Sequence, residues 1–196
     1  NGTVTNTTWT SAGEFGGALV FNGTNSSVGI PDSTSLHLTT GMTLEAWVNP
    51  TASPSAWRDV VYKGNDNYYL EATSDSAGKP AAGGLFGGSP ATVFGTAAPT
   101  ANAWSYLALT YDGTTIRLYV NGVQEGQLAA SIPIPTNNLA LGIGAQPDGL
   151  FGVLNGTMDD VLLYNTALTA SEIATLATAP PGDPVFVGAG DIAGTW

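Results

Sequence analysis

Six aromatic and polar residues close together in the sequence are the candidates for contacting a ligand. They are Trp57, Arg58, Tyr62, Asn67, Tyr68 and Tyr69. Exposed aromatic faces stack on sugar rings, and polar side chains nearby can hydrogen-bond to sugar hydroxyl groups. The Pro/Ser-rich segment before Trp57 favours an exposed contact, whereas the Val-Val-Tyr that follows favours entry into a core strand. Both interpretations of Trp57 stay open.

Side chains that could catalyse a reaction are sparse. Retaining glycoside hydrolysis needs two carboxyl groups about 5 Å apart, whereas Glu45 and Glu71 are isolated in the sequence. Glu45 lies inside a hydrophobic segment, where we expect a structural hydrogen bond. His37 is the only histidine and has no evident acid partner, and the chain has no cysteine. Without a phosphate-binding glycine loop or a serine nucleophile elbow, we predict no catalytic residue and no enzymatic activity.

The charge balance excludes several classes of partner. The 196 residues include 15 acids and 4 bases, which give a formal net charge of −11. Such a surface repels a phosphate backbone, so we expect no nucleic-acid partner. No apolar run is long enough to span a bilayer, and we expect no membrane insertion. The lack of cysteine rules out disulfides. Together with the few charges and the abundance of Gly, Thr and Asn, it favours a secreted or cell-surface protein of bacterial origin.

Short apolar segments separated by turn residues must position these side chains. They recur about every 8 to 12 residues, which is typical of a β-sandwich or barrel. Asp112-Gly113 and Asn121-Gly122 fit tight hairpin turns, because these dipeptides readily adopt positive φ angles. The expected strands cover residues 18–21, 27–30, 42–48, 60–62, 68–71, 104–111, 116–120, 140–144 and 158–164.

One short helix is expected near the end of this pattern. Thr169 or Ser171 can cap a helix over residues 172–176, and two turns at most fit before Pro180. Pro180-Pro181-Gly182 is typical of a linker. We therefore predict an all-β domain over residues 1–179, built from two antiparallel sheets with one short C-terminal helix, followed by a separate segment over 180–196.

Four segments, in this order, carry the motifs of a known family. They are Phe15–Gly23, Met42–Val48, Trp104–Gly122 and Gly156–Asn165, the last continued by Ala167-Leu168 and Glu172-Ile173. Together they resemble the laminin G-like, concanavalin A-like jelly-roll domains over about residues 9–177. The resemblance implies a jelly-roll sandwich and a non-catalytic accessory module that binds a polysaccharide or cell-surface glycan. Because such folds host many functions, a structural spacer or interaction domain with no ligand of its own is the alternative.

The resemblance also implies a structural calcium ion. Family members place one ion between the N-terminal loop and the last strand, and Ca²⁺ takes six to eight oxygen ligands, often carboxylates and backbone carbonyls. Carried over to this chain, the ligands would be Asn22, Gly23, Gly41 and Asp159. The alternative is that Asp159 and Asp160 are a solvated acidic pair at the start of a strand.

The segment after the linker resembles a different family. Asp183–Gly194 contains an apolar run that ends in Gly190-Asp191. This run is similar to the first strand of calcineurin-like metallophosphoesterases, in which such an aspartate holds one of two metal ions. The resemblance implies that residues 180–196 begin a second, enzymatic domain, to which the jelly roll would be attached. An ordinary C-terminal strand is the alternative.

Overall fold

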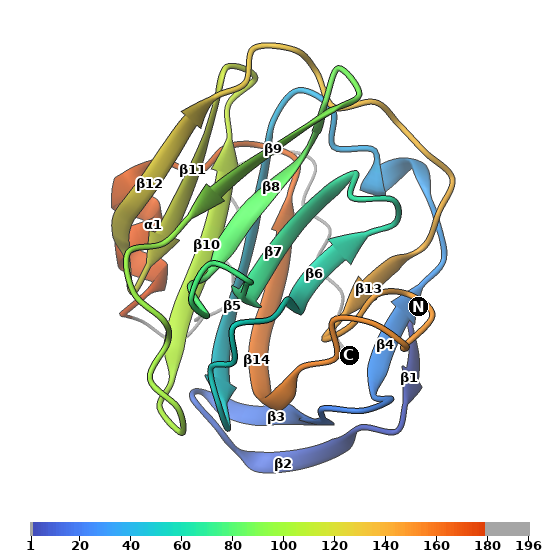
Figure 1. The fold of residues 1–196 in the computed structure, drawn as a ribbon, viewed down its shortest axis with the longest axis vertical. Helices are drawn as coiled ribbons and strands as arrows, with labels where there is room; N and C mark the ends of the chain where they lie inside the picture. The colour runs from blue at the N-terminus through green and yellow to red at the C-terminus, as the bar shows by residue number, and fades with distance from the viewer. Residues whose placement is uncertain (1, 179–196) are drawn as a thin grey trace.

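The chain folds into two antiparallel sheets that pack face to face, and the computed structural model describes residues 2–178. Sheet A has seven strands in the order β1-β4-β13-β6-β7-β8-β9. Their bounds in that order are Thr3–Thr5, Ser27–Ile30, Leu141–Ile143, Arg58–Lys63, Tyr68–Thr73, Ala81–Phe86 and Ser89–Phe94. In Figure 1 this sheet lies toward the viewer.

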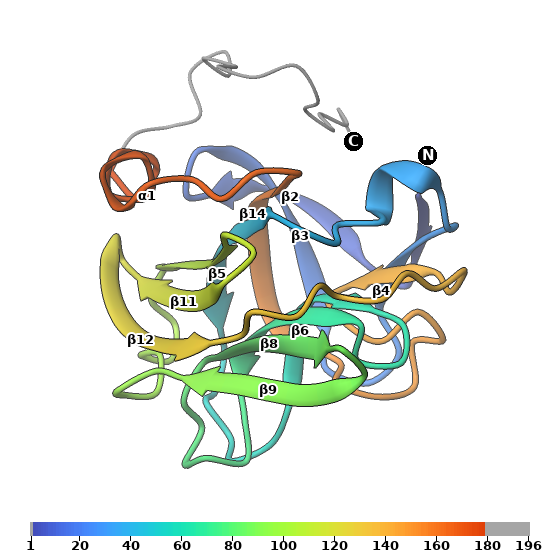
Figure 2. The same ribbon diagram turned by 90° about the horizontal axis from the view of Figure 1, so that it is seen from above.

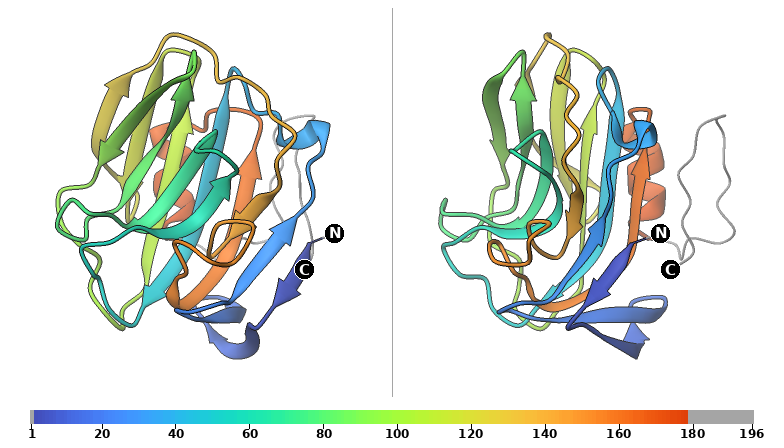
Figure 3. Two further views of the ribbon diagram at one scale, coloured as in Figure 1. Left: turned by 45° about the vertical axis from the view of Figure 1, so that its right-hand side comes forward. Right: turned by 90° about the vertical axis from the view of Figure 1, so that its right-hand side faces the viewer.

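Sheet B forms the second layer and also has seven strands, in the order β12-β11-β10-β5-β14-β3-β2. Their bounds in that order are Val123–Ala129, Thr115–Val120, Ser105–Tyr111, Met42–Pro50, Asn155–Tyr164, Gly16–Asn22 and Thr8–Gly13. A 3₁₀ turn, η1 (Thr34–Leu36), joins β4 to β5, and α1 (Ala170–Leu176) follows β14. Figure 2 and the right panel of Figure 3 show α1 against the side of sheet B that faces away from sheet A.

The main core lies between the two sheets. Strand β5 contributes Met42, Leu44, Ala46 and Val48, each with none of its surface exposed. Successive side chains of a strand point to opposite faces, so the intervening residues of β5 face α1. A second apolar cluster on that side contains Trp47, Tyr106, Ala108, Tyr119, Ile173 and Ala177. The middle of sheet B is therefore buried on both faces, whereas its edge strands β12 and β2 are largely exposed.

The structure confirms the predicted all-β sandwich with its short C-terminal helix. Asn121 and Gly122 both have positive φ angles, of 50° and 79°, as the hairpin between β11 and β12 requires. Thr169 caps α1 in a reciprocal capping box with Glu172. The strands β1, β2 and β9 were not predicted. Both β1 and β2 are polar and largely exposed and lack an apolar alternation. Among the described residues, no helix has the length and hydropathy needed to cross a membrane.

Glu45 is buried beneath α1 and makes the structural hydrogen bonds expected of it. Tyr106 Oη donates to Glu45 Oε2, and Tyr164 Oη donates to Oε1 over 3.1 Å. Burial raises the pKa of Glu45 to about 7, although the two hydroxyl groups act in the opposite direction. Ionisation of Glu45 at neutral pH therefore lowers the stability of the folded chain.

The raised pKa of Glu45 predicts a pH-dependent contribution to stability. Because the folded-state pKa lies above the usual 4.5, the contribution is fully present below about pH 4.5 and is lost as the pH rises through about 7. Glu45→Gln should reduce the change in the free energy of unfolding between about pH 4.5 and pH 7, by roughly 3 kcal/mol at most. Urea unfolding of both proteins from pH 4.5 to 8 measures it. Asp75→Asn, in an exposed turn, is the control, and an unchanged slope in Glu45→Gln would contradict the prediction.

Candidate functional site

The loop before β6 is held over the outer face of sheet A, the face turned away from sheet B. Thr73 Oγ1 of β7 donates to Ala56 O over 2.7 Å, and Ser55 Oγ donates to Asp75 O over 2.9 Å. Ser53 Oγ donates to Pro99 O. These hydrogen bonds tie the loop to three different segments, so the residue that ends it, Trp57, is held in place.

Trp57 stands on two other aromatic rings of this face. Its ring centroid lies 6.3 Å from that of Tyr69 and 6.3 Å from that of Phe94, with interplanar angles of 84° and 51°. Tyr69 is almost buried, and its hydroxyl group lies 2.6 Å from Thr92 Oγ1. Trp57 and Phe94 remain 36% and 38% exposed. The cluster thus presents a supported indole to solvent, which combines the packing and the exposed-contact interpretations of Trp57.

Two carboxyl groups are buried beside this aromatic cluster. Asp59 of β6 lies opposite Glu71 of β7 in the strand register, and each is 2% exposed. Burial raises the pKa of Asp59 to about 7, and burial together with the charge of Asp59 raises the pKa of Glu71. Asp59 Oδ2 and Glu71 Oε2 have no hydrogen-bond partner among residues 2–178. The expectation that Glu71 is isolated was therefore wrong, because strand register pairs residues that are twelve positions apart.

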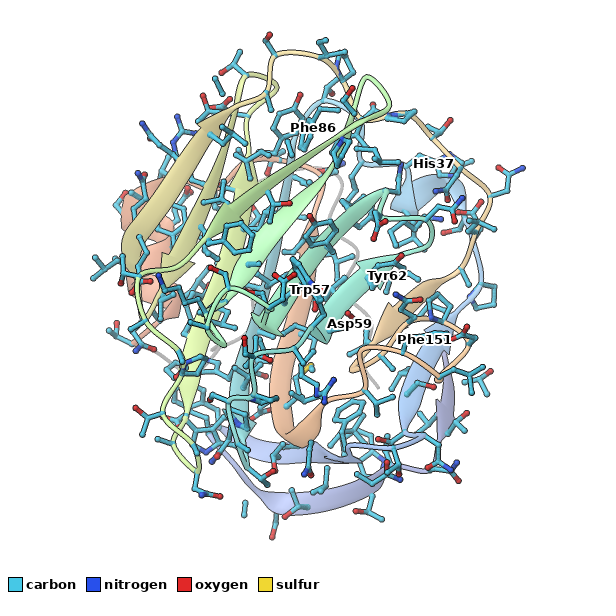
Figure 4. The ribbon with its side chains drawn as sticks, viewed as in Figure 1. His37, Trp57, Asp59, Tyr62, Phe86 and Phe151 are labelled. Carbon is cyan, nitrogen blue, oxygen red and sulfur yellow. The ribbon has the colours of Figure 1, made fainter. Side chains whose placement is uncertain are left out.

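The loop between β13 and β14 closes over Asp59. Asp59 N donates to Gly152 O over 2.7 Å, and the carboxylate lies against the α-carbon of Gly152, where a side chain would collide with it. Gly152 has a φ of 65°, which favours glycine. The two preceding residues, Leu150 and Phe151, are 69% and 63% exposed. Figure 4 shows Trp57, Asp59 and Tyr62 over the front sheet, with Phe151 to one side.

Four of the six predicted ligand contacts gather on this face. Besides Trp57 and Tyr69, these are Tyr62, which lies opposite Tyr69 in the register, and Arg58, whose Nη1 donates to Trp57 O over 2.8 Å. Tyr62 is largely buried, and its hydroxyl group accepts from Asp66 N. The four residues share one face because β6 and β7 pair directly.

The other two residues predicted to contact a ligand, Tyr68 and Asn67, are buried and do not lie at the surface. Tyr68 has none of its surface exposed and its hydroxyl group donates to Leu36 O over 2.9 Å inside the core. Asn67 is 3% exposed, and its Nδ2 donates to Pro135 O. The alternation of β7 sends Tyr68 to the opposite face from Tyr69. Phe94 and Phe151 were missed by the sequence analysis, because each directly follows an apolar residue, Val93 or Leu150, and such a pair favours a core position.

The predicted calcium ligands do not meet at one point. Asp159 faces Trp47 on β5, whereas Gly41 precedes Met42, so about six residues of strand, or roughly 20 Å, separate them. Asn22 pairs with Asn155, and its Oδ1 caps the turn by accepting from the backbone of Thr24 and Asn25. Among residues 2–178, no group of three or more His, Asp and Glu side chains could hold a metal ion. The four residues therefore do not fit one calcium ion.

Asp159 instead makes structural hydrogen bonds. Its Oδ2 accepts from Phe15 N and its Oδ1 from Asp160 N, both over 3.0 Å. Phe15 lies in the turn between β2 and β3, so Asp159 ties this hairpin to β14. Asp160 adopts a φ of 48° within a bulge, where the register shifts. The bulge interrupts the strand alternation of β14 at Asp159 and Asp160.

His37 has an acid partner that the sequence did not reveal. Its Nε2 lies 3.1 Å from Asp32 Oδ2, and Asp32 Oδ1 accepts from the buried Lys63 Nζ over 2.6 Å. Hydrogen bonds from these two groups lower the pKa of Asp32, that from Lys63 most. Figure 4 shows His37 far from Trp57. This trio accounts for the burial of Lys63 and lies outside the candidate site.

The sheet order and the two-layer arrangement together define a jelly-roll sandwich. Residues 22–174 match the family described as the concanavalin A-like lectin/glucanases superfamily, and the chain belongs to it. No curated protein gave a significant match. The predicted metallophosphoesterase-like strand, with Asp191, lies outside the residues that the structure describes.

Three solved structures illustrate the fold. The binding domain of Paraclostridial Mosquitocidal Protein 1 has a TM-score of 0.72 and 18% identity over 90% of this chain and 47% of that one. Domain 4 of an extracellular arabinanase from Geobacillus stearothermophilus, in complex with arabinotriose, has a TM-score of 0.71 and 22% identity over 90% of this chain and 87% of that one. The binding domain of botulinum neurotoxin serotype G has a TM-score of 0.66 and 13% identity, over 90% and 46%. The chain thus spans about half the length of the first structure, and these likenesses show the fold.

Asp159→Ala tests the structural role of this residue. The substitution leaves the backbone N–H groups of Phe15 and Asp160 without their acceptor, so we expect a loss of about 1–3 kcal/mol in the free energy of unfolding. The loss should be the same with EDTA and with added Ca²⁺. Urea unfolding under both conditions measures it. A loss that disappears in EDTA would mean that Asp159 acts through a bound ion.

Proposed function

We propose that this chain is a non-catalytic module of a secreted protein, and that it binds a polysaccharide or cell-surface glycan on the outer face of sheet A. The observation that carries the proposal is the exposed indole of Trp57, supported by Tyr69 and Phe94. A flat apolar ring with polar neighbours suits a sugar, which presents C–H groups on one face and hydroxyl groups around its edge. Arg58 and the exposed Asp66 supply hydrogen-bonding groups nearby.

The comparisons support this proposal at the level of the fold. One similar structure is domain 4 of an arabinanase, solved in complex with arabinotriose. Two further similar structures are the binding domains of a mosquitocidal protein and of a botulinum neurotoxin. A jelly roll attached to a larger protein as a binding module is therefore a documented arrangement of this fold, and the anchored loop of Trp57 supports the same use here.

The burial of Asp59 and Glu71 supports a non-catalytic role. The pair has the adjacent carboxyl groups that glycoside hydrolysis uses, but each side chain is 2% exposed and lies beneath neighbouring loops. A general acid must come within hydrogen-bond reach of the glycosidic oxygen. A substrate stacked on Trp57 would not reach these buried oxygen atoms without movement of the loop that contains Gly152.

Trp57→Ala should weaken glycan binding at least ten-fold, because it removes the stacking surface. The matched control is Trp9→Ala, since Trp9 is 59% exposed on β2 of the other sheet and should leave binding unchanged. A glycan array identifies a ligand, and isothermal titration measures the affinity of all three proteins. Equal losses in both variants, or no ligand in the array and in polysaccharide pull-downs, would favour the alternative of a structural spacer.

The chain should release no reducing ends from arabinan or β-glucan. Asp59→Asn and Glu71→Gln should therefore leave the background rate unchanged, because neither carboxyl group reaches a substrate. A reducing-sugar assay over long incubation measures this. Hydrolysis by the natural chain that either substitution abolishes would show that the buried pair is catalytic.

A further inference from the structure

The Asp59–Glu71 pair is the least compensated charged site among the described residues. Both side chains are 98% buried, which makes ionised oxygen atoms without partners costly. Asp59 Oδ2 and Glu71 Oε2 nevertheless have no hydrogen-bond donor in the described part of the chain. One proton shared between the two carboxyl groups would leave one negative charge and at least one oxygen atom still unpaired. A positive group bound between the two carboxylates would neutralise this charge and contact the unpaired oxygen atoms.

The surrounding charges increase this requirement. Asp66, in the turn between β6 and β7, and Asp148, in the loop between β13 and β14, both act electrostatically on Asp59 as negative charges. Among residues 2–178, Arg58 is the one positive group that acts on Asp59, and its Nη1 donates to Trp57 O. Lys63 on the same strand is held by Asp32. Two further acids thus act on the pair, against a single arginine among the described residues.

We propose that one divalent cation that prefers oxygen ligands, such as Ca²⁺, binds between the carboxylates of Asp59 and Glu71. Carboxylate oxygens are hard ligands that suit such ions, and two carboxylates supply up to four of the six to eight oxygen atoms that Ca²⁺ takes. The chain has no cysteine, and its one histidine is bound to Asp32 elsewhere, so the site offers no soft or nitrogen ligand.

The position of the pair gives the ion a structural consequence. Asp59 and Glu71 belong to adjacent strands, and the loop with Phe151 and Gly152 packs directly on Asp59. An ion between the carboxylates would fix this loop relative to β6 and β7, on the face that displays Trp57. Because it binds only the folded arrangement, it would also stabilise the native chain. The proposal does not depend on glycan binding.

Terbium titration of the full, metal-stripped chain tests the site directly. Tb³⁺ replaces Ca²⁺ at oxygen sites, and excitation of the nearby Trp57 and tyrosines should sensitise its emission. We expect one saturable Tb³⁺ equivalent that excess Ca²⁺ displaces, together with a rise in melting temperature of several degrees in Ca²⁺. Asp59→Asn and Glu71→Gln should each weaken binding at least ten-fold and remove the Ca²⁺ response, whereas Asp159→Asn should retain both.

The amide variants keep the shape of the site, so their folding can be verified in EDTA by circular dichroism and melting temperature. Equal or higher stability than the natural chain in EDTA, with no Ca²⁺ response, supports the proposal. The absence of Tb³⁺ binding and of any Ca²⁺ response in the natural chain would overturn it. Binding that Asp159→Asn abolishes and Asp59→Asn leaves intact would also overturn it. Loss of glycan binding in Trp57→Ala with Ca²⁺ binding retained separates this proposal from the proposed function.

Discussion

Burial of strand β5 on both of its faces is the constraint on which the rest of the fold depends. The strand lies in the middle of sheet B, with Leu44 and Val48 packed toward sheet A and Trp47 packed toward α1. Burying an aromatic side chain removes 150–250 Å² from water, roughly 4–6 kcal/mol at 25 cal/mol per Å². That gain is available only if the chain after β14 returns across sheet B and lays α1 over Trp47.

This constraint also decides where a ligand can bind. One face of sheet B is in the main core and the other is partly covered by α1 and the segment before it, which Thr43 ties down through Thr166 O. The outer face of sheet A has no helix over it among the described residues, and loops cover it instead (Figure 3). Loops can carry exposed side chains on a rigid support. Trp57 and Phe151 lie in two such loops, and β6 and β7 supply the support.

Local signals made most of the fold predictable. The Asn121-Gly122 turn, the capping box at Thr169 and the apolar run of β5 each depend on neighbours in sequence, and each lies where it was expected. The site was less predictable, because it depends on strand register. Nothing local shows that Asp59 faces Glu71, and a bulge in β6 shifts the alternation at that point. The exposed, polar β2 carries too little apolar pattern to be recognised as a strand.

The buried acids on the two sheets illustrate two ways of accommodating a carboxyl group away from water. Glu45 in sheet B receives hydrogen bonds from two tyrosine hydroxyl groups, so both of its oxygen atoms have donors. Asp59 and Glu71 in sheet A face each other instead and leave two oxygen atoms without donors. A pair of like charges is retained at a cost in stability unless something neutralises it. In the first arrangement both oxygen atoms have donors, whereas in the second two oxygen atoms have none among the described residues. This difference is the reason for proposing the cation site on sheet A, beside Trp57, rather than at Glu45.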